Sequence, residues 1–334
     1  MKIGILAITE GGKKLAGKLA AKMPASLVLP QEGGVARTLA EHWREMDGFV
    51  CIMASGIVVR AIAPLLQGKE YDPCVVVMDE KGRHAVSLLS GHLGGGNDLA
   101  REVAALLGGE AVITTASDTL GLAPLDLWAR EQGLVCESKK ALTHASARLV
   151  NSGTLTVFSE VPIVSLPPGL VSIDGPELAD VVVSHRLDNY GTALVFRPRN
   201  LVVGVGCNRG VPVAEIRLAC DELFEQEGLS QLSIRNLASI DLKQDETGLL
   251  ACADELGVRI DFFSKEELNR VANITISEAA LRNVGAIGVA EPAALLSAQS
   301  NDLLVGKRKW HNVTMAVARA NCTLSEQDRA LQNI

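Results

Sequence analysis

The chain has 334 residues, of which 48% are apolar and 21% are charged, and its formal net charge is −7 at pH 7. This balance is typical of a folded α/β enzyme and excludes an intrinsically disordered chain. Aromatic residues make up only 3% of the chain, which argues against a stacking platform for single-stranded nucleic acid. The acidic balance argues against a general polyanion binder, but it is compatible with a small anionic ligand held by a few local cations.

Seven cysteines are scattered singly along the chain and form no CxxC pair. Such spacing is typical of reduced thiols and favours a cytoplasmic protein. The apolar run at 2–8 is too short for a signal peptide or a membrane-spanning helix. The sequence also contains no HExxH, no GxSxG, no Walker A loop and no Cys/His cluster with metal-site spacing, so no metal site is predicted.

The first 120 residues alternate apolar runs with amphipathic stretches. The expected elements are strands at 2–8, 26–30 and 49–54, with helices near 13–23, 35–46 and 55–66. This alternation predicts a parallel sheet covered by helices. The apolar runs at 74–78 and 85–89 flank a Glu-Lys-Gly-Arg turn at 80–83, which predicts an antiparallel hairpin within the same sheet.

The pattern of apolar runs and helical stretches changes near residues 121 and 200. A helix at 139–150 and short apolar runs broken by prolines, at 154–159, 162–167, 180–185 and 192–198, predict a small central α/β unit. From residue 200 strands and helices alternate again and end in a hairpin over 303–319. We therefore predict a multi-domain α/β fold with mixed sheets flanked by helices. Its predicted parts are domains at 1–120, 121–199 and 200–320, and a polar tail at 321–334.

The stretch SGHLGGGND at 90–98 places His92 among four glycines at the start of a predicted helix. Glycines allow another group to approach the backbone closely. The alternative is a tight strand-to-helix connection with Asn97 as the helix cap. Because ligands of open α/β sheets bind beyond the carboxyl ends of strands, this loop, the Ser55-Gly56 turn and the turn containing Asp118 are expected to line one cleft. For Asp118 the alternative is ordinary capping of a helix.

Three further motifs carry cations. Arg60 follows the Ser55-Gly56 turn and is a candidate to bind an anionic ligand. Alternatively, its side chain extends from a half-buried helix into solvent. The loop GVGCNRGVP at 204–212 suits an anion at a helix N-terminus, strengthened by Arg209, although a purely structural turn is equally compatible. A triplet of cations at 307–309 is a docking point for carboxylates or, alternatively, a solvated hairpin end.

Taken together and in this order, the motifs resemble those of the cobalt-precorrin-5A hydrolase family of anaerobic cobalamin biosynthesis. In the first domain the resemblance rests on ASGIVVRAIAPLL, on DPCVVVMDEKGRHAVSLLSGHLGGGNDLA and on VITTASD. In the last domain it rests on VGVGCNRGVP, LASIDLKQDETGLL, FFSKEELN, GVAEPAALL, LLVGKRK and NVTMAVAR. It covers nearly the whole chain, although residues 121–199 contribute little.

The resemblance implies N-terminal, central and C-terminal domains and a specific reaction. Water opens the δ-lactone of cobalt-precorrin-5A, and the methylated meso carbon leaves as acetaldehyde, giving cobalt-precorrin-5B. Cobalt arrives with this anionic corrinoid substrate, so no cofactor of the protein's own is expected. Neighbouring pathway methyltransferases and a second copy of the chain are candidate partners, whereas nucleic acid and membranes are not.

Within this reaction we expect His92 to act as the general base and the N–H groups of residues 94–97 to hold the developing oxyanion. Asp118 or Glu291 is the expected acid or base of the carbon–carbon cleavage. The residues predicted to bind substrate are Ser55, Gly56, Arg60, Arg83, Ser90, Gly91, Gly94, Gly95, Gly96, Asn97, Gly204, Gly206, Arg209, Gly210, Asp241, Lys243, Lys307 and Arg308.

Two functions of other classes remain as alternatives. The chain could be a non-catalytic carrier of a corrinoid intermediate, with His92 as a ligand of cobalt; a carrier would bind substrate and product alike and release no acetaldehyde. It could also be a nucleotide-dependent oxidoreductase that uses GVGCNRG. That loop has Arg209 where the dinucleotide fingerprint needs a glycine, and binding of NAD or NADP would be the discriminating observation.

Overall fold

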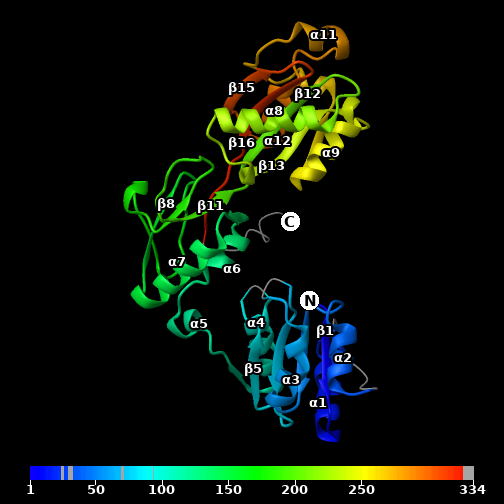
Figure 1. Ribbon diagram of the computed structural model, residues 1–334, viewed down its shortest axis with the longest axis vertical. Coiled ribbons are helices and arrows are strands. Elements are labelled where there is room, and N and C mark those ends of the chain that lie inside the picture. The colour runs from blue at the N-terminus through cyan, green and yellow to red at the C-terminus, as the bar shows by residue number, and fades with distance from the viewer. Residues whose placement is uncertain (24–25, 29–32, 69–70, 93, 326–334) are drawn as a thin grey trace. The chain divides into compact units, whose positions relative to one another are not determined.

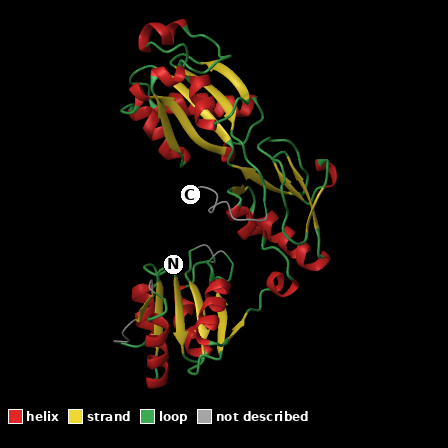
Figure 2. Cartoon of the chain, turned by 180° about the vertical axis from the view of Figure 1, so that it is seen from behind, coloured by secondary structure: helices red, strands yellow, loops and turns green. Residues whose placement is uncertain are grey.

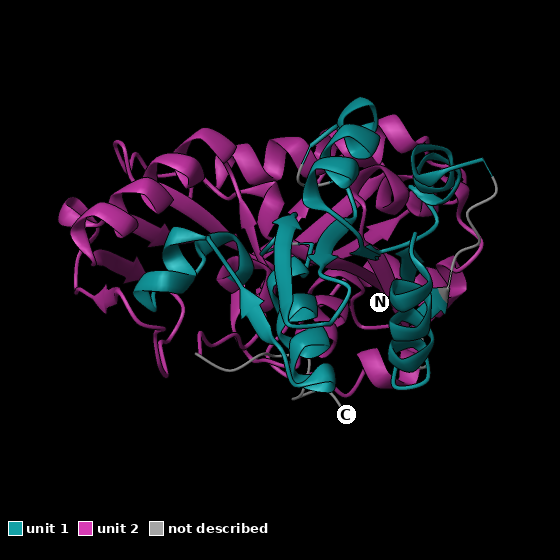
Figure 3. Ribbon diagram, turned by 90° about the horizontal axis from the view of Figure 1, so that it is seen from below, with its two compact units in different colours: residues 1–127 teal, residues 128–334 magenta. Residues whose placement is uncertain are grey.

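The computed structural model describes all residues except 24–25, 29–32, 69–70, 93 and 326–334. The chain divides into two compact units, residues 1–127 and 128–334, which Figure 3 shows in different colours. One mixed sheet lies in the first unit and two lie in the second, each flanked by helices. The predicted α/β class is confirmed, while the domain boundaries near residues 120 and 199 stay predictions.

The first unit is built on a six-stranded sheet in the order β2-β1-β3-β4-β5-β6. Figure 2 shows strands in yellow and helices in red. The strands are β1 (Ile3–Ala7), β2 (Ser26–Val28), β3 (Gly48–Ile52), β4 (Cys74–Met78), β5 (His84–Leu89) and β6 (Glu110–Val112). The helices are α1 (Glu10–Ala20), α2 (Val35–His42), α3 (Ser55–Ile62), α4 (Gly96–Leu107) and α5 (Ala116–Leu120), and α6 (Leu125–Glu131) runs into the second unit. The unbroken apolar sequences of β1, β3 and β4 follow from burial on both faces of the sheet, because every residue of these strands is buried.

Strand direction reverses once within this sheet. Strands β1 to β4 are mutually parallel, β5 runs antiparallel to β4, and β6 runs parallel to β5. The hairpin predicted from the Glu-Lys-Gly-Arg turn is therefore confirmed. Helices α1 and α4 pack on one face of the sheet and α2 and α3 on the other, which leaves the two strand-end edges for loops.

The central sheet of the second unit has the order β7-β11-β10-β8-β9. Its strands are β7 (Leu134–Cys136), β8 (Leu155–Ser159), β9 (Leu170–Ser172), β10 (Val181–Val183) and β11 (Leu194–Pro198), with α7 (Lys139–Ser152) beside them. The strand predicted at 162–167 is wrong, because prolines at both ends of this run lack the N–H that a ladder needs. Only Ile163 forms an isolated bridge, to Leu324. Leu324 is fully buried, so the predicted tail begins as packed structure; its remainder, 326–334, lies outside the described residues.

The last sheet has the order β14-β13-β12-β16-β15 and is labelled in Figure 1. Its strands are β12 (Leu201–Cys207), β13 (Ile234–Ile240), β14 (Arg259–Phe263), β15 (Leu303–Lys309) and β16 (Val313–Arg319). The helices are α8 (Val213–Gln226), α9 (Thr247–Leu256), α10 (Lys265–Leu268), α11 (Glu278–Val284) and α12 (Ala290–Ala298). Short 3₁₀ turns are η1 (Ala63–Leu65), η2 (Pro176–Leu178), η3 (Gln231–Ser233) and η4 (Asp241–Lys243). Leu201, Val203 and Val205 face the core under α8 and α9, and Val202 faces the core under α12, as strand alternation requires.

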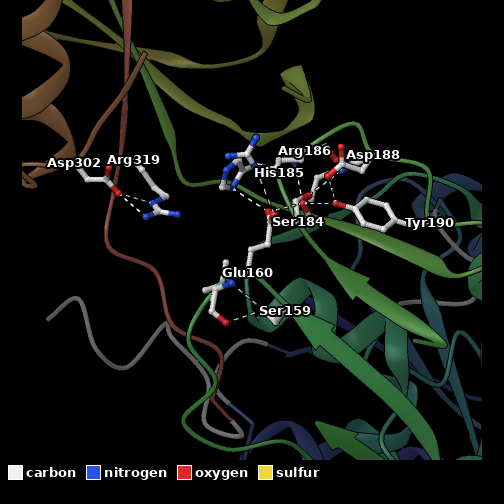
Figure 4. Close-up of polar contacts among 11 residues, drawn as sticks. Ser159, Glu160, Ser184, His185, Arg186, Asp188, Tyr190, Asp302 and Arg319 are labelled. Carbon is white, nitrogen blue, oxygen red and sulfur yellow. Dashed lines mark hydrogen bonds and ion pairs between the residues drawn. The ribbon is translucent and has the colours of Figure 1, made fainter. Parts of the chain in front are cut away.

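A buried histidine, His185, lies two residues after the end of β10 and is labelled in Figure 4. His185 is 1% exposed, and neither of its ring nitrogens has a hydrogen-bond partner among the described residues. Its Nδ1 lies 3.8 Å from Glu160 Oε2, an oxygen that already accepts a 2.5 Å hydrogen bond from Ser184 Oγ. Burial lowers the pKa of His185, because the neighbouring Glu160 does not offset the lost hydration of the imidazolium. The folded protein therefore holds this imidazole neutral.

Acidification should consequently destabilise the second unit. Because the pKa of His185 is lower in the folded state, the unfolded chain binds the proton first, and stability present above the unfolded value of about 6.5 is lost as the pH falls below it. The slope contributed by one such group is at most about 1.4 kcal/mol per pH unit. His185→Leu should flatten the pH dependence of the urea unfolding free energy between about pH 6.5 and 5.5, whereas His144→Asn, at an exposed position, should not. An unchanged slope in the His185 variant would contradict this account.

Candidate functional site

The edge of the first sheet beyond β5 and β6 brings His92 and Asp118 together. These two strands are parallel neighbours, so the loops that follow them leave the sheet at the same edge. His92 Nε2 lies 2.8 Å from Asp118 Oδ2 and 3.2 Å from Ser117 Oγ. The His92 and Asp118 side chains are 19% and 15% exposed, so the imidazole is held firmly but can still be reached.

Asp118 is kept ionised by the donors around it. Burial on its own would raise the pKa of this carboxyl, but hydrogen bonds from Arg101 and His92 outweigh it and lower the pKa. Arg101 Nη2 lies 2.5 Å from Oδ1, and Asn97 Nδ2 lies 2.9 Å from Oδ2. An ionised carboxylate can only accept hydrogen bonds, so the proton shared with the imidazole resides on Nε2. His92 Nδ1 then carries the free lone pair and can act as a base.

The glycines of this loop let it fold tightly on itself. Gly95 has a φ of +79°, in the left-handed region, and stands at the cap position of α4 in place of the predicted Asn97. A Cβ at Gly94 would lie 2.5 Å from Ser90 Cβ, and one at Gly91 would lie 2.7 Å from Asn97 Oδ1. The glycines thus hold His92 in place, and the tight-connection interpretation describes the loop.

The prediction that the N–H groups of residues 94–97 hold an oxyanion is wrong for three of them. The N–H groups of Gly95, Gly96 and Asn97 donate to the carbonyl oxygens of His92, Ser90 and Gly91 at 2.9, 3.0 and 2.9 Å, respectively. These donors are used within the loop itself and cannot also be aimed at a substrate.

The Ser55-Gly56 turn does not share a cleft with His92, contrary to the prediction. It follows β3, whereas His92 follows β5, and the two strands run in opposite directions. Ser55, Gly56, Arg60 and the turn containing Arg83 therefore lie at the other edge of the sheet. That edge holds a cavity of about 420 Å³ lined by Ser55 but not by Gly56 or either arginine. Arg60 and Arg83 are exposed, as the interpretation of Arg60 as a solvated side chain expected.

A second concentration of predicted residues lies in the last sheet of the second unit. A cavity of about 600 Å³ opens beyond the ends of β12 and β13, between α11, the start of α12 and the β15–β16 hairpin. It brings together Gly206, Arg209, Lys243 and Lys307, which the sequence predicted as substrate-binding residues. Lys309 and Trp310 also line it.

Other predicted residues of this region have different contacts. A Cβ at Gly204 would collide with the Ala290 carbonyl oxygen, so this glycine lets α12 pack on β12. The Gly210 N–H donates to Glu246 Oε1 at 2.8 Å. Asp241 begins η4 and is not among the residues lining the cavity. Arg308 pairs at 2.7 Å with Glu227, directly after the end of α8, and does not line the cavity, so the structure does not group it with the other predicted substrate-binding residues.

Glu291 links separate segments of the second unit by hydrogen bonds. It is 3% exposed, and its oxygens accept hydrogen bonds from the N–H and hydroxyl of Thr275 at 2.5 and 3.1 Å and from Lys307 N–H at 2.8 Å. These bonds join α12 to β15 and to the segment before α11. A carboxylate so occupied has little freedom to move protons for a substrate.

Sequence reasoning overlooked Arg101 and gave Lys309 no separate role. A signal for Arg101 was available, because Asn97 and Arg101 are four residues apart on α4 and therefore share one helix face, the face that meets Asp118. For Lys309 the signal was its two-residue spacing from Lys307 on a strand.

Comparison with known proteins identifies the family. Residues 37–118 match the family model described as Cobalamin synthesis G N-terminal, and residues 201–318 match Cobalamin synthesis G C-terminus. A cobalt-precorrin-5A hydrolase of Priestia megaterium is 37% identical over 309 residues, covering 86% of this chain and 82% of the relative. The chain belongs to the cobalt-precorrin-5A hydrolase family. The resemblance stated from the motifs is thereby confirmed.

Other relatives of the family cover the chain more completely at lower identity. The cobalt-precorrin-5A hydrolase of Salmonella typhimurium is 30% identical over 345 residues, covering 95% of this chain and 97% of the relative. The crystal structure of a putative cobalamin biosynthesis protein G homolog from Sulfolobus solfataricus is 24% identical, with a TM-score of 0.39, and covers 95% of this chain and 96% of that one. His92 and Asp118 lie within the first matched region of the family models, and the residues that line the 600 Å³ cavity lie within the second.

Removing the Glu291 carboxylate should weaken the fold of the second unit. Glu291→Ala should lower the urea unfolding free energy by about 1.5–3 kcal/mol, since a hydrogen-bonded charged group contributes on that scale. Glu291→Gln keeps one acceptor oxygen and should lose less. An unfolding free energy unchanged in both variants would contradict this linking role and return Glu291 to the candidates for chemistry.

Proposed function

We propose that this chain catalyses the hydrolysis of cobalt-precorrin-5A, opening its δ-lactone and releasing acetaldehyde to give cobalt-precorrin-5B. Membership of the family supports the hydrolase assignment and its place in cobalamin biosynthesis. The observation that carries the mechanism is the imidazole–carboxylate pair of His92 and Asp118 at the edge of the first sheet. The reaction consumes one water, whose oxygen enters the new carboxylate, while the lactone oxygen leaves on the meso carbon as the aldehyde oxygen.

In this proposal His92 Nδ1 takes the proton of the attacking water and gives it to the lactone oxygen as the acyl–oxygen bond breaks. This leaves a hydroxyl on the meso carbon and a neutral imidazole, and the new carboxylic acid loses its remaining proton to solvent. Asp118 accepts from Nε2–H, so it fixes the tautomer and stabilises the imidazolium that forms. Arg101 and Asn97 act through Asp118 as positioning residues, because each donates to one of its oxygens. Asp118 is thereby assigned to orientation and not to a separate proton transfer.

The carbon–carbon cleavage needs a second proton transfer. Once the lactone is open, the hydroxyl left on the meso carbon must lose its proton so that its electrons can form the aldehyde carbonyl. The electron pair of the broken carbon–carbon bond then takes up a proton on the macrocycle. We assign both transfers to His92, because Asp118 is held ionised and Glu291 is occupied by three hydrogen bonds.

The proposal includes no cofactor of the protein's own, since cobalt enters with the substrate. Within the described ranges no group of three or more His, Cys, Asp or Glu side chains is placed to hold a metal ion, and no helix is long and apolar enough to cross a bilayer. The seven cysteines, all within the described ranges, form no disulfide. A cytoplasmic location, a homodimer and contact with neighbouring methyltransferases stay predictions.

His92→Ala should lower the turnover of cobalt-precorrin-5A by about 10²–10⁴ with little change in substrate affinity, since a base acts mainly in the transition state. Acetaldehyde release measures the effect. His84→Ala, at the first residue of β5 and therefore at the opposite edge of the sheet from the loop that holds His92, is the matched control. Release at the wild-type rate by the His92 variant would make His92 structural. An altered visible spectrum and weaker binding of the corrinoid would instead assign His92 to cobalt ligation.

Arg101→Met should reduce kcat roughly tenfold with KM nearly unchanged, because Asp118 loses the partner that best holds it ionised. The pKa of Asp118 should rise in this variant, because the hydrogen bond from Arg101 that lowers it is lost. Arg101→Lys keeps a cation and should restore part of the rate. A kcat and a pH profile equal to wild type in the methionine variant would remove Arg101 from the mechanism.

A further inference from the structure

The cavity of the second unit is lined by cations and by no acidic side chain. Arg209, Lys243, Lys307 and Lys309 all border it, although the whole chain carries a net charge of −7. A concentration of one charge sign in an acidic protein calls for a ligand of the opposite sign.

Two of these cations are already paired within the protein. Arg209 pairs with Asp245, and Lys243 Nζ lies 3.0 Å from Glu246 Oε2. Lys307 and Lys309, by contrast, have no ion pair and no side-chain hydrogen bond to any residue that the structure describes. Lys307 is half-buried and Lys309 is exposed. These two ammonium groups are therefore available to a ligand.

The β15 strand places the two lysines side by side. Alternate residues of a strand face the same side, with Cα atoms about 6.6–6.8 Å apart. Both Lys307 and Lys309 are observed to line the cavity, while Arg308 between them pairs with Glu227, directly after the end of α8. The strand thus presents a pair of cations at a spacing suited to two separate carboxylates.

The remaining walls suit the edge of a flat organic ring. Ile240, Val284 and Val289 supply apolar surface, and the indole of Trp310 borders the cavity while its Nε1 donates to Glu222 at 2.7 Å. A volume of about 600 Å³ is enough for one edge of a large macrocycle with its side chains and too small for the whole.

We propose that this cavity binds two neighbouring carboxylate side chains on one edge of the corrinoid macrocycle, one on Lys307 and one on Lys309. The identity of the ligand rests on the proposed function. Because each contact is a charge-assisted hydrogen bond between an ammonium group and a carboxylate, the site selects free acids over amidated side chains. Lys309 becomes a specificity-determining residue, and Arg308 takes no part.

Binding of a corrinoid with free carboxylates, cobyrinic acid, tests this directly through quenching of tryptophan fluorescence in the full-length protein. Lys307→Ala and Lys309→Ala should each weaken binding by about 10-fold or more, the scale of a hydrogen bond to a charged group. Arg308→Ala, on the same strand, should bind as wild type does. The same corrinoid with amidated side chains should bind weakly to wild type and equally weakly to both lysine variants. Trp310→Phe should remove most of the quenching.

Three results would overturn the proposal: no binding of cobyrinic acid by wild type, lysine variants that bind like the Arg308 variant, or an amidated corrinoid that binds as tightly as the acid. Acetaldehyde release keeps this outcome separate from the hydrolase assignment. If wild type releases acetaldehyde and the lysine variants raise KM with kcat nearly unchanged, both proposals hold. If wild type binds the acid through the lysines but releases none, only the hydrolase assignment fails.

Discussion

The ionised state of Asp118 is the constraint on which the chemistry of the first unit depends. Burial of this carboxyl, which is 15% exposed, raises its pKa, and the donors from α4 and from the imidazole outweigh that effect and lower the pKa, so the carboxylate stays charged. Once charged, it can only accept, which places the His92 proton on Nε2 and leaves Nδ1 to meet the substrate. The short glycine loop completes the arrangement, because its internal hydrogen bonds leave the imidazole little freedom to swing away.

The pairing of these residues depends in turn on the reversal of strand direction at β5. If β5 ran parallel to β4, its loop would leave the sheet beside the Ser55 turn, at the opposite edge from the one observed. Because β5 runs antiparallel and β6 follows it, the loops after both strands meet at one edge, and α4 starts there with Asn97 and Arg101 facing Asp118. Proton transfer is thus assigned to the first unit. The cation-lined cavity for substrate carboxylates belongs to the second, and each of the two matched family regions contains one of these features.

Much of this could be predicted from local sequence. The hairpin at 74–89 follows from its turn residues, and the importance of His92 and Asp118 follows from their position beyond strand ends. The prediction that Ser55 and His92 share one cleft was wrong, because it grouped strand ends without regard to strand direction. Only the assembled sheet reveals the direction of each strand. The prediction of oxyanion donors was wrong because it treated the N–H groups of the glycine loop as free. The sequence does not reveal that these groups form hydrogen bonds within the loop.

Along β15 the prediction from sequence did not separate Arg308 from the lysines on either side of it. Alternation over 307–309 would have separated Arg308 from the two lysines. Which side faces the cavity could not be counted from the apolar residues at the start of the strand, because the register shifts between Val305 and Arg308. Glu291 was expected to act as an acid or base in the carbon–carbon cleavage. Its actual partners, Thr275 and Lys307, are each sixteen residues away in sequence, which no local pattern discloses.

The central claim is that Asp118 holds His92 with its proton on Nε2 and its lone pair on Nδ1. Nitrogen NMR of the protein labelled at histidine, with the His92 signals assigned by their absence from His92→Ala, reports the tautomer of this imidazole directly. The account predicts the Nε2–H form of the neutral ring in wild type and a mixture of both tautomers in Asp118→Asn, where the acceptor is no longer charged. A wild-type ring with its proton on Nδ1 would contradict the account, because the base would then face Asp118 instead of the substrate.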